Sequence, residues 1–113
     1  MTGPSRELQT LKADFFRTMA HPARIRILEV LSDKGELSVQ SLQEQVSADQ
    51  PAVSQQLAKL RAHGVVTSRK EGTTVIYALA DPRIADLLKI AKDILNRRLT
   101  GSTTLLHELQ SHG

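Results

Sequence analysis

Apolar residues recur every three or four positions near the start of the chain, which is the spacing of one face of an α-helix. This pattern predicts a helix from about Ser5, its expected N-cap, to Met19. The apolar positions of this helix are Leu8, Leu11, Phe15 and Met19, with Phe16 widening the stripe.

A proline separates this helix from the next one. His21-Pro22 interrupts the pattern, because a proline keeps the residue before it out of the α region and itself suits the first turn of a helix. A second helix is therefore expected from Pro22 to about Ser32, ended by the stop signal at 33–35. Its buried positions are expected to be Ile25, Leu28 and Leu31.

Two shorter helices follow, joined by a short turn. The first is expected after Ser38, and the second after Asp49, since both residues can cap the exposed amides of a helix start. The first ends near Val46 and the second at His63-Gly64. Two helices with this connection predict a helix-turn-helix. Their inward positions are Val39, Leu42 and Val46 in the first, and Val53, Leu57 and Leu60 in the second.

After Gly64 the pattern changes from helical to alternating. Two β-branched runs, 65–68 and 74–78, flank a charged tip with a glycine, which predicts a β-hairpin. A last long helix is expected to start at Asp81-Pro82 and to end near Gly101. The chain is thus predicted to be mainly α-helical with one small β-hairpin, in the order α-α-α-α-β-β-α.

Composition narrows the class of protein. A chain of 113 residues fits one domain, expected over residues 1–101, with 102–113 as a C-terminal tail that is at most partly helical. The absence of cysteine excludes disulfides and thiolate metal sites, and the net charge of +3 favours a polyanionic partner. Without an apolar run long enough for a membrane span or the pattern of a signal peptide, a cytoplasmic protein is expected, with no membrane partner.

The middle of the chain resembles the ArsR/SmtB family of transcriptional regulators. The resemblance covers about residues 15–99 and rests on the segments 20–28 (AHPARIRIL), 36–42 (ELSVQSL) and 50–61 (QPAVSQQLAKLR), continued by the hairpin from Glu71 to Tyr77. It implies a winged helix-turn-helix that binds double-stranded DNA as a homodimer, more often as a repressor than as an activator.

Candidate DNA contacts lie on the second helix of the helix-turn-helix and on the hairpin. The outward face of that helix is small and polar, which suits entry into a major groove about 12 Å wide and recognition of base edges. Lys59 and Arg61 are expected to contact phosphates, and the hairpin tip is expected to act as a wing. The full set is Gln50, Pro51, Ser54, Gln55, Gln56, Lys59, Arg61, Arg69, Lys70, Thr73 and Thr74.

The apolar stripes of the first and last helices are wider than a monomer core requires. The resemblance implies that these helices form the dimer, so that two copies read a pseudo-palindromic operator with half-sites about one helical turn apart. A competing interpretation packs the excess apolar residues against the tail. The expected interface residues are Leu8, Leu11, Phe15, Leu87, Ile90, Ala91 and Ile94.

Many members of this family release DNA on binding a metal, but the matching ligand positions are mostly vacant here. No thiolate stands at or near Ser38, and only Asp81 matches the last-helix site, where Arg83, Ile94 and Arg97 occupy the other places. His107, Glu108 and His112 form a loose tail cluster that could hold nickel or zinc. No cofactor is otherwise required.

Other functions find less support in the sequence. It contains no cysteine nucleophile, phosphate-binding glycine loop or zinc-hydrolase motif, so an enzyme is not expected. The alternatives left open are a winged-helix protein-interaction module and a nickel- or zinc-responsive regulator that uses the tail histidines. The effector could equally be a regulatory protein or a small organic ligand.

Overall fold

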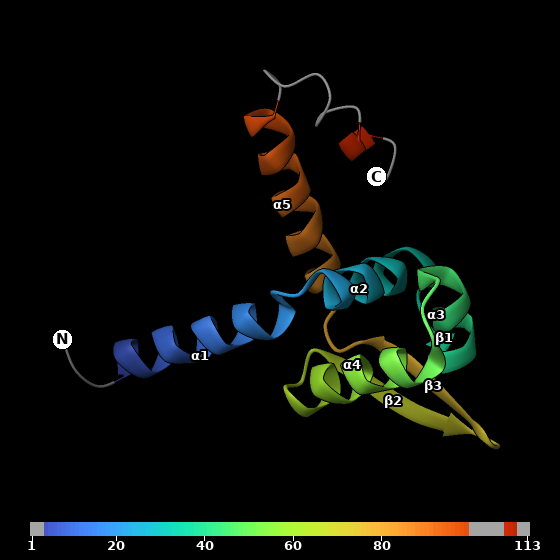
Figure 1. The fold of residues 1–113 in the computed structure, drawn as a ribbon. Helices are drawn as coiled ribbons and strands as arrows, with labels where there is room; N and C mark the ends of the chain where they lie inside the picture. The colour runs from blue at the N-terminus through green and yellow to red at the C-terminus, as the bar shows by residue number, and fades with distance from the viewer. Residues whose placement is uncertain (1–3, 100–107, 111–113) are drawn as a thin grey trace. The chain divides into compact units, whose positions relative to one another are not determined.

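The computed structural model describes residues 4–99 and 108–110 of the chain (Figure 1). These residues divide between two compact units, 1–82 and 83–113, which are described separately below. The elements are α1 (Pro4–Met19), α2 (Pro22–Lys34), β1 (Leu37–Ser38), α3 (Val39–Val46), α4 (Gln50–Ala62), β2 (Val66–Glu71), β3 (Thr74–Leu79) and α5 (Arg83–Arg98). The predicted order is confirmed, with one short strand added before α3.

Helix boundaries follow the expected local signals with small differences. Helix α1 begins at Pro4, so Ser5 lies inside the helix instead of capping it. Helix α2 continues to Lys34, two residues beyond Ser32, and ends where the Gly35 amide donates a hydrogen bond to the Leu31 carbonyl at 2.9 Å. Gly35 has a φ of 84°, a conformation that L side chains rarely adopt, which explains why the helix stops there.

Both predicted caps of the helix-turn-helix are present. The Ser38 hydroxyl accepts a hydrogen bond from the Ser41 amide at 3.1 Å, and the Asp49 carboxylate accepts one from the Ala52 amide at 2.8 Å. Each satisfies an amide that has no partner within its own helix. The starts of α3 and α4 are therefore fixed by short-range chemistry.

The sheet has three antiparallel strands in the order β1-β3-β2. Strands β2 and β3 pair from Val66 opposite Leu79 to Glu71 opposite Thr74, and Gly72, with a φ of 63°, occupies the first position of the two-residue turn. A positive φ at that position is typical of a type II′ turn, which matches the twist of a hairpin. Strand β1 pairs Leu37 with Tyr77, so the predicted hairpin is the larger part of the sheet.

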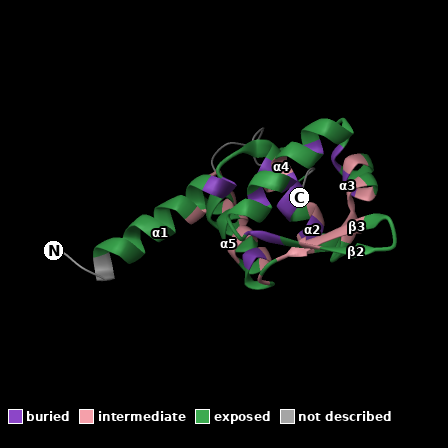
Figure 2. Ribbon diagram, turned by 90° about the horizontal axis from the view of Figure 1, so that it is seen from below, coloured by how far each residue is buried: buried purple, intermediate pink, exposed green. Residues whose placement is uncertain are grey.

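The core lies between α2, α3, α4 and the sheet, and its buried residues appear in purple in Figure 2. In α4 the inward positions are as predicted, whereas in α2 the fully buried isoleucine is Ile27 and Ile25 is only half-buried. Close packing of branched aliphatic side chains supplies most of the stabilisation. The fully buried residues are Ile27, Leu28, Leu31, Leu42, Val53, Leu57, Leu60, Val65 and Val66.

Helix α5 belongs to the second unit. It starts at Arg83, just after Asp81-Pro82, as the proline predicted. Three of its large apolar residues, Ile90, Ile94 and Leu95, are 45–56% exposed. No helix within the described residues is long and apolar enough to cross a membrane.

Candidate nucleic-acid interface

Helix α4 has one buried face and one exposed polar face. Val53, Leu57 and Leu60 are in the core, and they hold the helix against α2, α3 and β2. The opposite face carries only small or polar side chains, so the helix backbone can approach a groove closely. The exposed residues of this face are Gln50, Pro51, Ser54, Gln55, Ala58 and Lys59.

A left-handed residue sets the turn between α3 and α4. Ser47 has a φ of 54°, and among the described residues it is the only one other than glycine with a positive φ. It ends α3, whose last turn is closed by hydrogen bonds from the Ser47 and Ala48 amides to the Gln43 carbonyl. The reversal of the chain at this point brings α3 and α4 together as a helix-turn-helix.

Gln56 differs from its neighbours on α4. It is half-buried, and its amide oxygen accepts a hydrogen bond from the Arg24 side chain of α2 at 2.8 Å. Gln55, by contrast, is exposed. Both glutamines are among the DNA contacts expected from the sequence, and the structure places them in different environments.

The last turn of α4 is basic. Lys59 and Arg61 are exposed, and neither forms an ion pair with another residue in the described part of the chain. Their positive charges are available to phosphate oxygens, and they also complement the negative end of the helix dipole.

The wing is the β2–β3 hairpin, and β2 packs on α4. Its charged tip includes Lys70, exposed and without an ion pair to a described residue, and the exposed hydroxyls of Thr73 and Thr74. Arg69 is different: its guanidinium lies 2.8 Å from Glu36 and 2.5 Å from Glu71. The hydrogen bonds that Arg69 donates to Glu71 and then to Glu36 raise the pKa of Arg69 above its ordinary value, so this side chain stays cationic but is engaged by two carboxylates.

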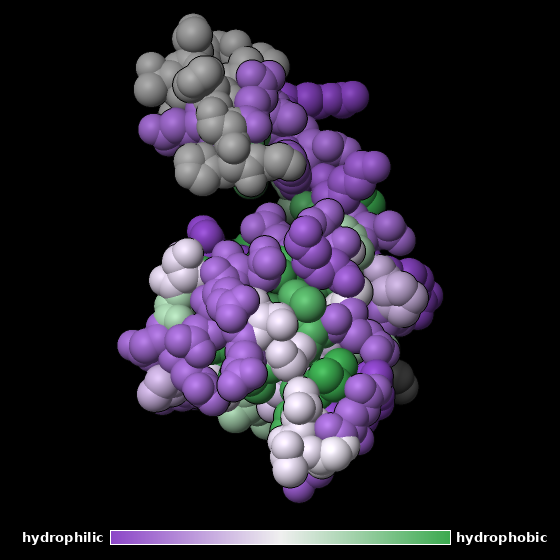
Figure 3. Space-filling model, turned by 90° about the vertical axis from the view of Figure 1, so that its right-hand side faces the viewer, coloured by the Kyte–Doolittle hydropathy of each residue, from purple (hydrophilic) through white to green (hydrophobic). Residues whose placement is uncertain are grey.

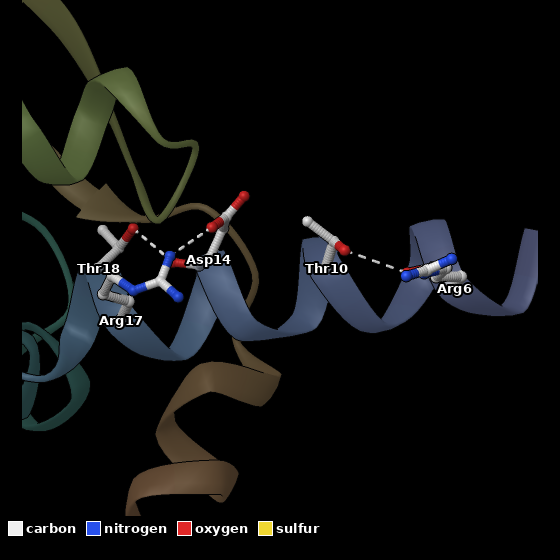
Figure 4. A network of polar contacts seen from close by, with 5 residues as sticks. All are labelled: Arg6, Thr10, Asp14, Arg17 and Thr18. Carbon is white, nitrogen blue, oxygen red and sulfur yellow. Dashed lines mark hydrogen bonds and ion pairs between the residues drawn. The ribbon is translucent and has the colours of Figure 1, made fainter.

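Helix α1 carries large apolar side chains that are exposed to solvent. Leu8, Leu11 and Phe16 are 51–65% exposed, and Phe15 is half-buried in an edge-to-face contact with Phe16. The polar contacts drawn in Figure 4 run along the same helix: Thr10 with Arg6, and Arg17 and Thr18 with Asp14. In Figure 2 the helix is exposed over nearly its whole length and buried only at its C-terminal end.

Apolar surface of this kind is not a general property of the molecule. Figure 3 shows a face on which hydrophilic residues predominate and hydrophobic ones form small separate patches.

The exposed apolar positions on α5 include the predicted Ile90, Ala91 and Ile94, while Leu87 is half-buried. Phe16 and Leu95, which were not among the expected interface residues, are also strongly exposed.

The candidate metal ligands lie mostly outside the described residues. Glu108 is exposed in a short helical piece, whereas His107 and His112 fall in the segments for which no structure is given. Residues 4–99 and 108–110 contain no group of three or more histidine, aspartate or glutamate side chains placed to hold a metal. His21 and His63 are exposed.

A helix-turn-helix with an exposed, polar second helix and a hairpin with a charged tip beside it defines a winged-helix DNA-binding protein. Comparison with known proteins agrees with this class. The model of the family described as "Bacterial regulatory protein, arsR family" matches residues 21–68. The chain belongs to this ArsR family and is a DNA-binding transcriptional regulator.

Individual relatives match over most of their length. The chain is 43% identical over 109 residues to the HTH-type transcriptional regulator Rv0081 of Mycobacterium tuberculosis, covering 96% of each chain. The crystal structure of Rv0081 superposes with a TM-score of 0.75 at 46% identity, over 88% of this chain and 97% of that one.

Two further solved structures share the fold. The transcriptional repressor BigR from Xylella fastidiosa has a TM-score of 0.67 and 28% identity, over 81% of this chain and 96% of that one. The homodimeric winged helix-turn-helix domain of Mb0332 from Mycobacterium bovis has a TM-score of 0.79 at 23% identity, over 91% of this chain and 94% of that one.

Proposed function

We propose that the protein is a homodimeric repressor that reads a pseudo-palindromic operator by inserting α4 into the major groove. The observation that carries this proposal is the exposed face of α4. Its residues are small or polar while the opposite face is buried in the core, so the helix is rigidly held and still able to approach base edges.

The residues have distinct roles in this proposal. Gln55 and Ser54 read bases from the centre of the exposed face, with Gln50 and Pro51 at its N-terminal end. An exposed glutamine can donate to N7 and accept from N6 of adenine, which makes Gln55 the main base-reading residue. Lys59, Arg61 and Lys70 contact phosphates, and Thr73 and Thr74 donate to the backbone from the wing.

Two of the expected contacts take modified roles. The amide oxygen of Gln56 is committed to Arg24, so Gln56 does not offer a base the paired donor and acceptor of a free glutamine side chain. Arg69 reaches a phosphate only by exchanging the Glu36 and Glu71 carboxylates for phosphate oxygens.

Exposed apolar surface on α1 and α5 supports the homodimer. Burying a leucine, isoleucine or phenylalanine side chain stabilises an interface by about 1.5–3 kcal/mol, so leaving six such large side chains in water is costly for a monomer. The M. bovis domain with the same fold is homodimeric. The proposed interface comprises Leu8, Leu11, Phe15, Phe16, Leu87, Ile90, Ala91, Ile94 and Leu95.

Repression is proposed because BigR, a relative with the same fold, is a transcriptional repressor. A dimer that occupies about two turns of DNA excludes other proteins from that site. The protein acts on DNA in the cytoplasm, without catalysis, and residues 1–101 carry DNA binding and dimerisation.

The tail cluster of His107, Glu108 and His112 is the proposed site for a nickel or zinc effector.

The test is a fluorescence-anisotropy titration at roughly 150 mM salt. The protein first selects duplexes from a random pool, and its affinity for the selected operator is compared with that for a scrambled duplex and for the DNA upstream of its own gene. A preference of about a thousandfold or more supports the proposal. Equal affinity for all duplexes contradicts it and favours a winged-helix module that binds a protein partner.

A further inference from the structure

Among the residues that the structure describes, Arg24 is the only charged residue that is buried, with 7% of its surface exposed. It lies in the first turn of α2, where the helix dipole disfavours a positive charge. Burying a cation away from water is also costly unless hydrogen bonds replace the lost hydration. The position of Arg24 therefore has to be explained by what its guanidinium contacts outside α2.

The guanidinium joins two other helices. Its Nη1 donates to the Thr18 carbonyl in the last turn of α1 at 2.9 Å, and its Nε donates to the Gln56 amide oxygen of α4 at 2.8 Å. The Thr18 carbonyl is one of the four at a helix end that have no partner within the helix, and this end of the dipole favours a cation. Thr18 is itself 6% exposed, and its hydroxyl donates to the Asp14 carbonyl at 2.8 Å (Figure 4).

The chemistry of the contact fixes the glutamine as well. Arginine has only donors, so Gln56 must present its oxygen to Arg24. Gln56 is half-buried between exposed Gln55 and fully buried Leu57, and a fixed side chain at this point resists rotation of α4 about its own axis. One arginine thus connects the end of α1 to the flank of α4.

We infer that Arg24 is a positioning residue for DNA recognition, which sets the orientation of α4 relative to α1 through Gln56 and the Thr18 carbonyl. The inference rests on the proposed function, in which α1 belongs to the dimer interface and α4 enters the groove. A rigid link from one to the other determines how far apart the two recognition helices stand, and hence which half-site spacing the dimer accepts.

The experiment measures affinity for the selected operator and for versions with one base pair added or removed between the half-sites. The wild type is expected to lose about a hundredfold in affinity on the altered spacings. Arg24→Met and Gln56→Met are each expected to weaken binding to the operator roughly tenfold and to flatten the spacing preference to below about tenfold. Their affinity for scrambled DNA should change less than twofold.

A double-mutant comparison separates positioning from general stability. Because both substitutions break the same contact, the Arg24→Met/Gln56→Met pair should bind the operator no more weakly than Arg24→Met alone. Gln55→Met is the matched control on α4, and its effect should add in full to that of Arg24→Met. If Arg24→Met does not fold, the half-buried Gln56→Met variant tests the same contact from the other side.

The outcomes distinguish this inference from the proposed function. If the wild type prefers one spacing and both methionine variants keep that preference, the positioning role is wrong and the repressor proposal stands. If the wild type binds all duplexes equally, the repressor proposal fails and the positioning role fails with it.

Discussion

The guanidinium of Arg69 in the wing lies 2.8 Å from the carboxylate of Glu36 and also contacts Glu71 within the same strand. All three side chains are about half exposed. A cation expected to meet phosphate is therefore already paired with two carboxylates in the free protein. DNA binding by this side chain is a competition between carboxylate and phosphate oxygens.

We expect Glu71→Gln to tighten DNA binding, because it removes a competing carboxylate and its repulsion of phosphate. The affinity for operator and scrambled duplex should both rise roughly threefold or more, and the slope of log affinity against log salt should steepen by about one. Asp14→Asn, which changes the charge equally on α1, is the control. An unchanged or lower affinity would mean that the carboxylates hold the wing in place.

Gln55→Ala tests direct base recognition. It is expected to cost about 1–3 kcal/mol on the operator while leaving scrambled DNA unaffected, because a base contact carries sequence information and a phosphate contact does not. Anisotropy titrations on both duplexes measure this, with Gln9→Ala, an exposed glutamine on α1, as control. A similar loss on both duplexes would remove Gln55 from base recognition.

Leu11→Glu and Ile90→Glu test the dimer. Each change occurs twice in a symmetric interface and replaces apolar burial with a charge, so the dissociation constant of the dimer should rise about a hundredfold or more. Analytical ultracentrifugation measures the constant, and circular dichroism checks that the monomer is folded. The controls are Lys12→Glu and Lys89→Glu, exposed neighbours on the same helices. Dimers that persist in both apolar-to-glutamate variants would place the interface elsewhere.

Substitutions at Ser47 test the left-handed backbone conformation in the turn of the helix-turn-helix. With a φ of 54°, the backbone penalises a β-branched side chain and suits glycine. Ser47→Val is expected to lower the free energy of unfolding by about 1–2 kcal/mol relative to Ser47→Gly, as measured by urea denaturation. Equal stability of the two variants would show that the turn adopts another conformation in solution.

Truncation after Gly101 tests whether the C-terminal tail binds a metal effector. If the tail holds the effector, the full chain should take up nickel or zinc and change its operator affinity on doing so, and the shortened chain should do neither. Isothermal titration calorimetry measures uptake, with His63→Ala in the full chain as control for an exposed histidine elsewhere. Equal uptake and unchanged DNA binding in both lengths would exclude a functional metal site in the tail.

Elements fixed by neighbouring residues were predictable. The caps at Ser38 and Asp49 act over three residues, and the apolar spacing of α4 identified its buried positions, so the helix-turn-helix and its exposed face followed from the sequence. Strand β1 was not predicted, because its two residues are extended only through pairing with β3. Arg24 had one sequence signal, a cation in the first turn of a helix.

The sequence by itself determined the class of protein, since hydrophobic periodicity, capping residues and prolines act within one or two turns of chain. Tertiary structure decided which polar residues are free to meet DNA. Arg24 and Gln56 are 32 residues apart, and Glu36 reaches Arg69 from the segment before β1. Whether such groups meet depends on how the helices and the sheet pack, and local patterns carry no information on that packing.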